Sequence, residues 1–140
     1  MTKRSLLTAA VITLLFLVTI FHLAAKAQSP DSTPQAIRTA IIQAIGADER
    51  SVEVSITHNV FRVSRVNSSL NQTTHGARDG EASRIATLVA KMIAGNTAYK
   101  NIHTIRVLYV AKLKPGGYEK VIDTADFRRD PSGVFQFHTT

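Results

Sequence analysis

The hydrophobic pattern of the chain changes period several times, and each change marks an expected element. Across positions 34–45 apolar residues recur at spacings of three and four, which predicts an amphipathic helix. Ser32 or Thr33 can cap its start, Pro34 suits its first position, and Gly46 can end it in the left-handed conformation. The apolar stripe of this helix must pack on another element.

Across positions 51–66 the period becomes two, which is typical of strands. A two-residue turn at His58 and Asn59 makes the segment a β-hairpin and places nearly all its large apolar side chains on one face. A single long strand with a bend is the alternative. The hairpin pairs are Val52 with Arg65, Val54 with Val63, Ile56 with Phe61, and Ser55 with Arg62.

A second helix is expected from about Arg78 to Ala94, with Gly95 as its stop. Its helically spaced apolar residues would face the core, while charged and polar residues face water. If the helix begins as early as Thr74, His75 joins the same row. The expected core row is Ala82, Ile85, Ala86, Val89 and Ile93.

Three further strands are expected at 104–112, 119–129 and 134–138, with turns at 114–117 and 130–133 between them. The element order is therefore α-β-β-α-β-β-β. This order predicts an α+β fold, in which a mostly antiparallel sheet of four to five strands carries two helices on one face.

Such a sheet has a second face that no expected helix covers. Strand alternation puts five residues of interest on it, and a surface that mixes apolar groups with arginine is typical of protein interfaces. The alternative is that small apolar residues simply sit on an exposed sheet face. The candidate interface residues are Arg62, Arg106, Leu108, Val110 and Arg128.

The N-terminal residues have the pattern of a targeting segment. Lys3 and Arg4 precede an uncharged stretch, and a small-residue tail ends in Ala25-Lys26-Ala27. This is the layout of a secretory signal peptide over residues 1–27, with an uncleaved membrane anchor as the alternative. Either fate places residues 28–140, a single α+β domain, across the membrane.

Composition narrows the location further. The chain has no cysteine, which fits a bacterial periplasm better than a disulfide-rich secreted domain; secretion or attachment to the inner membrane remain the alternatives. The formal net charge of the whole chain is +7. Without Lys3, Arg4 and Lys26, 14 basic residues face 10 acidic ones, a balance typical of an ordinary solvated surface.

The stretch that begins near Thr74 is richest in reactive side chains. His75, Arg78 and Glu81 could together bind a carboxylate or phosphate near the start of the second helix. The simpler interpretation is helix capping, because acidic residues suit a helix N-terminus. Asp123 and Asp126 point to opposite faces of their strand, so they do not form a catalytic carboxylate pair.

Recognisable catalytic motifs are lacking in the sequence. There is no cysteine, no Gly-x-Ser-x-Gly and no Ser-x-x-Lys, and no two histidines have the short spacing of a zinc site. No catalytic residue, metal or cofactor is therefore predicted, and a nucleic-acid partner is not expected.

These observations favour an exported, non-catalytic binding module that uses the outer sheet face or an edge strand. Its expected partner is a protein, a second copy of the chain, or an anionic component of the cell envelope. The alternatives are a small enzyme with a site around His75, Arg78 and Glu81, and a passive domain tethered to the membrane.

Overall fold

The computed structural model describes residues 32–113 and 117–138. The predicted signal peptide or anchor, residues 1–27, lies outside the described residues, as do positions 114–116 of the predicted turn. Neither described helix has the length and apolar character needed to cross a membrane.

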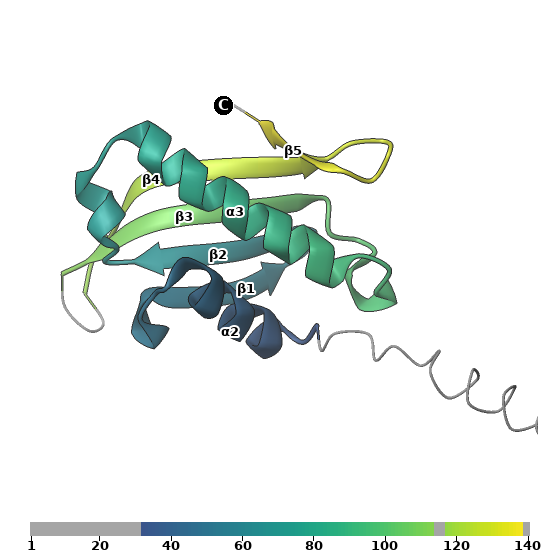
Figure 1. The fold of residues 1–140 in the computed structure, drawn as a ribbon, viewed down its shortest axis with the longest axis horizontal. Coiled ribbons are helices and arrows are strands. Elements are labelled where there is room, and N and C mark those ends of the chain that lie inside the picture. The colour runs from purple at the N-terminus through teal and green to yellow at the C-terminus, as the bar shows by residue number, and fades with distance from the viewer. Residues whose placement is uncertain (1–31, 114–116, 139–140) are drawn as a thin grey trace, which may run out of the picture. The chain divides into compact units, whose positions relative to one another are not determined.

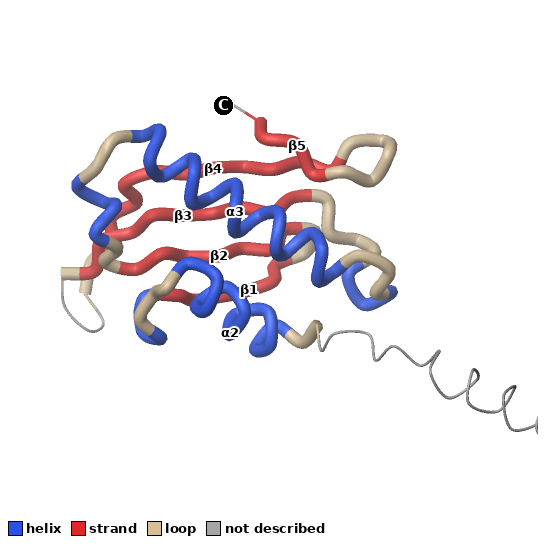
Figure 2. The backbone as a smooth tube through the Cα atoms, in the orientation of Figure 1, coloured by secondary structure: helices blue, strands red, loops and turns tan. Residues whose placement is uncertain are grey.

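Two helices lie on one face of a five-stranded sheet (Figures 1 and 2). The predicted α+β class and the predicted element order are both confirmed. The strands neighbour one another in chain order, from β1 at one edge to β5 at the other. The elements are α2 (Pro34–Ile45), β1 (Val52–Thr57), β2 (Val60–Val66), α3 (His75–Ile93), β3 (Thr104–Lys112), β4 (Glu119–Arg129) and β5 (Phe135–His138).

The sheet is mixed rather than purely antiparallel. β2 and β3 run parallel, with Phe61 opposite Ile105 and Val63 opposite Val107, whereas the other three pairings are antiparallel. The reason is the connection, because α3 carries the chain back along the sheet so that β3 starts beside the start of β2 (Figure 1). Hairpins alone can build only antiparallel pairs.

The ends of α2 are as the sequence predicts. The Thr33 hydroxyl accepts a hydrogen bond from the backbone N–H of Ala36 at 3.2 Å, and Pro34 occupies the first position. Gly46 ends the helix at φ 62°, where a side chain would strain the backbone. Ile37 and Ile41 form the buried stripe of this helix.

The predicted hairpin register is confirmed at every pair, including Val54 with Val63 and Ser55 with Arg62. His58 has a φ of 55°, so the two-residue turn adopts the backbone twist that suits a hairpin. In this register Arg65 pairs with Val52, and its side chain lies on the helix-covered face.

The second helix begins three residues before the predicted start at Arg78. Thr74 is its N-cap, and its hydroxyl accepts a hydrogen bond from the N–H of Ala77 at 3.3 Å. The earlier start at Thr74, which the sequence left open, is therefore correct. The polar stretches also contain short 3₁₀ helices that periodicity did not indicate, at Glu49–Ser51, Ser69–Gln72 and Thr97–Tyr99.

The core lies between the helices and the sheet. The predicted row on α3 is buried, and it packs over the inward residues of β2, β3 and β4. Near the start of α3 this core becomes polar. The central buried residues are Ile37, Ile41, Phe61, Val63, Ile85, Val89, Ile105, Val107 and Phe127.

Candidate functional site

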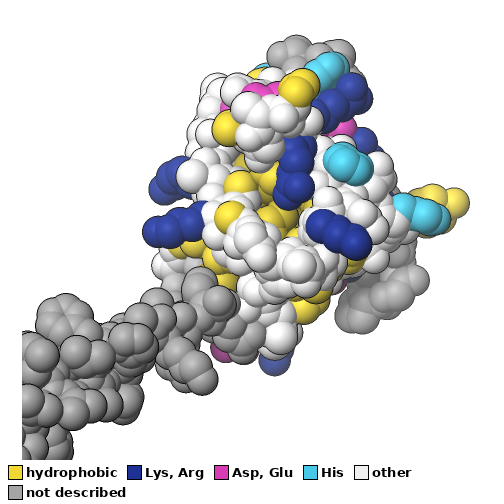
Figure 3. Space-filling view, turned by 90° about the vertical axis from the view of Figure 1, so that its right-hand side faces the viewer, with side chains coloured by type: hydrophobic (Ala, Val, Ile, Leu, Met, Phe, Trp, Pro, Cys, Tyr) yellow, Lys and Arg dark blue, Asp and Glu magenta, His cyan; other side chains and the backbone are white. Residues whose placement is uncertain are grey.

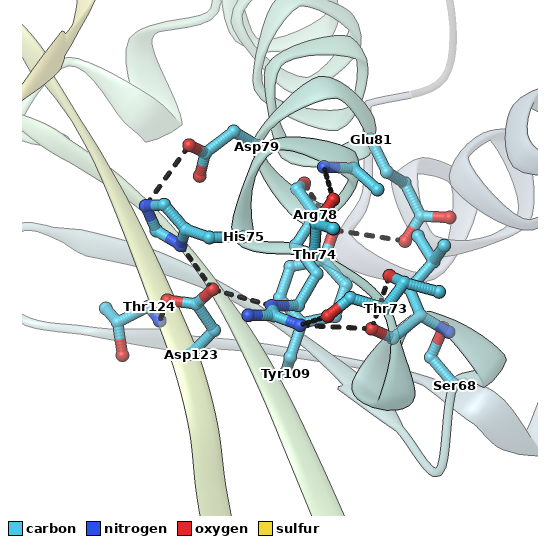
Figure 4. A network of polar contacts seen from close by, with 12 residues as sticks. Ser68, Thr73, Thr74, His75, Arg78, Asp79, Glu81, Tyr109, Asp123 and Thr124 are labelled. Atoms are coloured by element: carbon cyan, nitrogen blue, oxygen red, sulfur yellow. Dashed lines mark hydrogen bonds and ion pairs between the residues drawn. The ribbon is translucent and has the colours of Figure 1, made fainter.

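The polar end of the core gathers residues from three strands and one helix. Strand pairing places Arg65, Tyr109 and Asp123 side by side across β2, β3 and β4. The first turns of α3 lie over them and contribute the candidates His75, Arg78 and Glu81 (Figure 4). The structure therefore brings the three sequence-predicted residues into one polar network.

Arg65 and Glu81 form a buried ion pair. The Arg65 Nε donates to Glu81 Oε1 at 2.8 Å, and each side chain is 7% exposed. The Arg65 Nη1 donates to the Ser51 carbonyl oxygen at 3.1 Å and to the Ser51 hydroxyl at 2.9 Å. The guanidinium is thus bonded on two sides, which a buried charge requires.

Tyr109 bridges α3 and the sheet beside this pair. Its hydroxyl lies 2.9 Å from the Arg78 carbonyl oxygen and 3.2 Å from Glu81 Oε1, and its single proton is shared between these two acceptors. Burial, together with the negative charge of Glu81, raises the pKa of Tyr109 well above its ordinary value. The phenol therefore stays protonated and acts as a donor.

Arg78 and Asp123 form the second ion pair. The Arg78 Nε donates to Asp123 Oδ2 at 2.6 Å, and Nη1 donates to the carbonyl oxygens of Leu70 at 3.2 Å and Thr73 at 2.6 Å. Burial alone would raise the pKa of Asp123, but the hydrogen bonds from Arg78 and His75 outweigh it, so the pKa is lowered. Through these hydrogen bonds Arg78 connects the loop before α3 to β4.

His75 lies at the surface of the network, with its side chain 61% exposed. Its Nδ1 is 2.6 Å from Asp123 Oδ2, and its Nε2 is 3.2 Å from Asp79 Oδ2. The hydrogen bond to Asp123, and then the charges of Asp123 and Asp79, raise the pKa of His75. The imidazolium form is therefore favoured between the two carboxylates (Figure 4).

The chemistry open to this network is limited by its own bonds. A general base needs a free lone pair within reach of a substrate, but the Glu81 side chain is only 7% exposed and its Oε1 already accepts from Arg65 and Tyr109. Arg78 is likewise engaged by Asp123 and two carbonyl groups. Within residues 32–113 and 117–138, no group of three His, Asp or Glu side chains could hold a metal ion.

Sequence reasoning missed three members of the network, namely Arg65, Tyr109 and Asp123. One signal was present, because the predicted hairpin register already put Arg65 on the apolar side opposite Val52. A charged residue in a core row implies a buried partner of opposite charge. Periodicity could not show which carboxylate that partner would be.

We expect the contribution of His75 to stability to depend on pH. Since its folded pKa is raised above the ordinary value of about 6.5, the stabilisation is fully present below about pH 6.5 and is lost as the pH rises through the folded pKa. His75→Gln should therefore melt at a lower temperature than the unmodified protein near pH 6 and at the same temperature near pH 9.

Thermal unfolding followed by circular dichroism at both pH values measures this difference, and His103→Gln at another exposed histidine is the control. Asp123 sets the lower end of the pH range in which the network is stable. Because its pKa is lowered, its ion pairs weaken only as the pH falls through that folded pKa. A His75→Gln deficit that is equal at pH 6 and pH 9 would show that the imidazolium is not the stabilising form.

The uncovered face of the sheet holds most of the other predicted residues. Strand pairing aligns Arg62, Arg106, Asp126 and His138 in one row, with Arg128 in the next. Arg106 binds Asp126 through two hydrogen bonds of 2.7 Å, and this pairing lowers the pKa of Asp126. Arg128 is exposed, with its Nη1 3.4 Å from His138 Nε2.

Arg62 is exposed and forms no ion pair with any residue in the described part of the chain. Leu108 is half-buried on the same face, between Ser64 and Thr124. Val110 is only 1% exposed, at the point where the β3–β4 register shifts, so it offers no surface to a partner. The accessible part of the predicted interface is therefore its arginine-rich end.

Comparison of the chain with family models, with curated proteins and with solved structures finds no match. Any function has to be argued from the residues and their contacts.

Proposed function

We propose that this protein is an exported, non-catalytic binding module whose uncovered sheet face takes an acidic surface of a partner protein. The observation that carries the proposal is the exposed arginine-rich end of that face. Arg62 and Arg128 are exposed there, and both helices lie on the opposite side of the sheet (Figure 1). Export is supported by the sequence pattern of residues 1–27, and a periplasmic location by the absence of cysteine.

The arrangement of charge on this face suits protein recognition. The ion pair with Asp126 fixes the position of the Arg106 side chain. Its neighbour in the row, Arg62, has no carboxylate partner among the described residues. Half-buried Leu108 adds apolar surface in the neighbouring row. Arginine beside apolar groups is enriched at protein interfaces, and an acidic surface would supply the missing opposite charge.

The enzyme alternative has less support. His75, Arg78 and Glu81 meet in space, but both ring nitrogens of His75, the Nε of Arg78 and the Oε1 of Glu81 already have partners in Asp79, Asp123, Arg65 and Tyr109. A substrate that used these atoms would first have to displace their partners. The network therefore fits a structural role better than a catalytic one.

A charge-reversal experiment tests the proposed face. Arg62→Glu combined with Arg128→Glu should weaken binding to a glutamate-rich peptide about tenfold, because two exposed attractive charges become repulsive. The control reverses two exposed charges on the solvent side of α3, with Arg84→Glu and Lys91→Glu, and changes the net charge by the same amount. Titration calorimetry at two salt concentrations measures both.

The control pair should lose much less affinity than the outer-face pair. Equal losses in the two variants would mean that the peptide senses only net charge, which would contradict a specific face. Sedimentation of the unmodified protein completes the test, because a dimer abolished by the outer-face pair would assign this face to a second copy of the chain instead.

A further inference from the structure

A hollow lies on the helix-covered side, between the second half of α3 and the turn that joins β4 to β5. Its volume is about 320 Å³. Ala86, Ala90 and Ala94 line one wall at helical spacing, and Val134 and Phe135 line the other. Figure 3 looks onto this end of the molecule, where hydrophobic side chains form the floor of a depression and basic side chains stand around it.

Arg129 is the charged residue of this hollow. Its Cζ lies 4.9 Å from the ring centroid of Phe135, the residue that pairs with it across β4 and β5. Its Nε is buried and has no hydrogen-bond acceptor in the described part of the chain. A buried N–H without an acceptor costs about 1–3 kcal/mol, so such a group in a native protein needs an explanation.

The nearest acidic residue in the chain does not supply that acceptor. Asp130 Oδ1 accepts hydrogen bonds from the Ser132 N–H at 2.9 Å and the Val134 N–H at 3.0 Å, which stabilise the predicted turn. The hydrogen bond from the Ser132 hydroxyl, with the others in this turn, lowers the pKa of Asp130. Its Oδ1 is therefore used by the turn, and Arg129 forms no ion pair with any acidic residue that the structure describes.

Arg129 also lines a second hollow, of about 260 Å³. Its lining is more polar and includes Asn96, Thr97 and the exposed Lys100. One cation, Arg129, is therefore shared by a mainly apolar space and a more polar one. The carbonyl end of α3 also lies here and favours a nearby cation, but it gives the Arg129 Nε no hydrogen bond.

We propose that these hollows form a binding site for a small amphiphilic carboxylate. The apolar body packs between Ala90 and Phe135, and the carboxylate binds the Arg129 guanidinium with Lys100 beside it. Guanidinium groups match carboxylates in geometry, and sites of a few hundred cubic ångströms with few polar groups are usual for small ligands. The site is separate from the outer sheet face.

The probe is octanoate, used below the concentration at which octanoate forms micelles. It is titrated into the protein, and binding is followed by calorimetry and by amide NMR shifts. We expect saturable binding, with shifts concentrated at residues 86–94 and 129–135. Arg129→Met keeps an unbranched apolar side chain and removes the guanidinium with its charge, and it should weaken binding about tenfold. Ala90→Leu should block the apolar space and have a similar effect.

Lys91→Met is the matched control. Lys91 is an exposed cation on α3, the helix that lines the apolar hollow, but Lys91 itself lines neither hollow. It should leave octanoate affinity unchanged, and 1-octanol should bind at least about tenfold more weakly than octanoate. If Arg129→Met fails to fold, the amide shifts of the unmodified protein and the octanoate affinity of Lys100→Met still test the proposal. Non-saturable binding, shifts elsewhere, or equal binding of octanol would overturn the proposal.

Discussion

Glu81→Ala should lower the free energy of unfolding by about 3–5 kcal/mol, the usual cost of removing one partner from a buried ion pair. Arg65 is left in the core with its Nε unpaired, although Ser51 still accepts from its Nη1. Tyr109 loses one of its two acceptors. A domain of this size is stable by only about 5–15 kcal/mol, so the variant should be close to unfolding.

Urea denaturation followed by circular dichroism measures the loss. Combining Arg65→Met with Glu81→Leu should restore stability to within about 1 kcal/mol of the unmodified protein, because neither charge then remains buried. Glu53→Ala is the exposed control, since Glu53 pairs with Lys112 at the surface at 2.7 Å and should matter little. If Glu53→Ala costs as much as Glu81→Ala, burial is not the reason for the effect.

Phe61→Ala should cost about 3–5 kcal/mol through the cavity it leaves. Phe61 is fully buried on β2, opposite Ile56 on one side and Ile105 on the other. Its ring also meets Tyr99 edge-on, with centroids 6.2 Å apart. Little in this tightly paired strand can move to fill the space.

The same urea experiment applies, with Phe137→Ala on the edge strand as control. Phe137 is 46% exposed and touches Phe127 from one side only, with ring centroids 5.3 Å apart, so its loss should be much smaller. A larger loss for Phe137→Ala than for Phe61→Ala would place the stabilising core at β4 and β5 instead.

The elements of this fold could be predicted wherever local pattern and tertiary environment agree. Apolar and polar residues alternate over 51–57 and again over 61–64, so the pairing of Val54 with Val63 was visible in the sequence. At the start of α3 the local sequence pattern and the tertiary environment disagree. His75 to Gly80 is polar and contains two glycines, and its helical state is supported by Arg78 and His75 binding Asp123, which lies far away in the chain.

The candidate site was predictable in part for the same reason. His75, Arg78 and Glu81 could be selected because helical spacing groups residues along one element. Their partners come from three strands, and only the parallel pairing of β2 with β3 brings Arg65 and Tyr109 together. That pairing depends on how the whole chain closes, which local periodicity does not contain.

The parallel junction has a consequence for folding kinetics. β1 with β2, and β3 with β4 and β5, can each form from neighbouring segments, whereas Val60 must find Thr104 across the whole of α3. Closing so long a loop costs entropy before any contact compensates for it, so the docking of these two pieces should be the slow step. If the two pieces dock one residue out of register, Arg65 points away from the helices and Glu81 is buried without its partner. Such misdocked chains should therefore be unstable and should dissociate before they dock in the correct register.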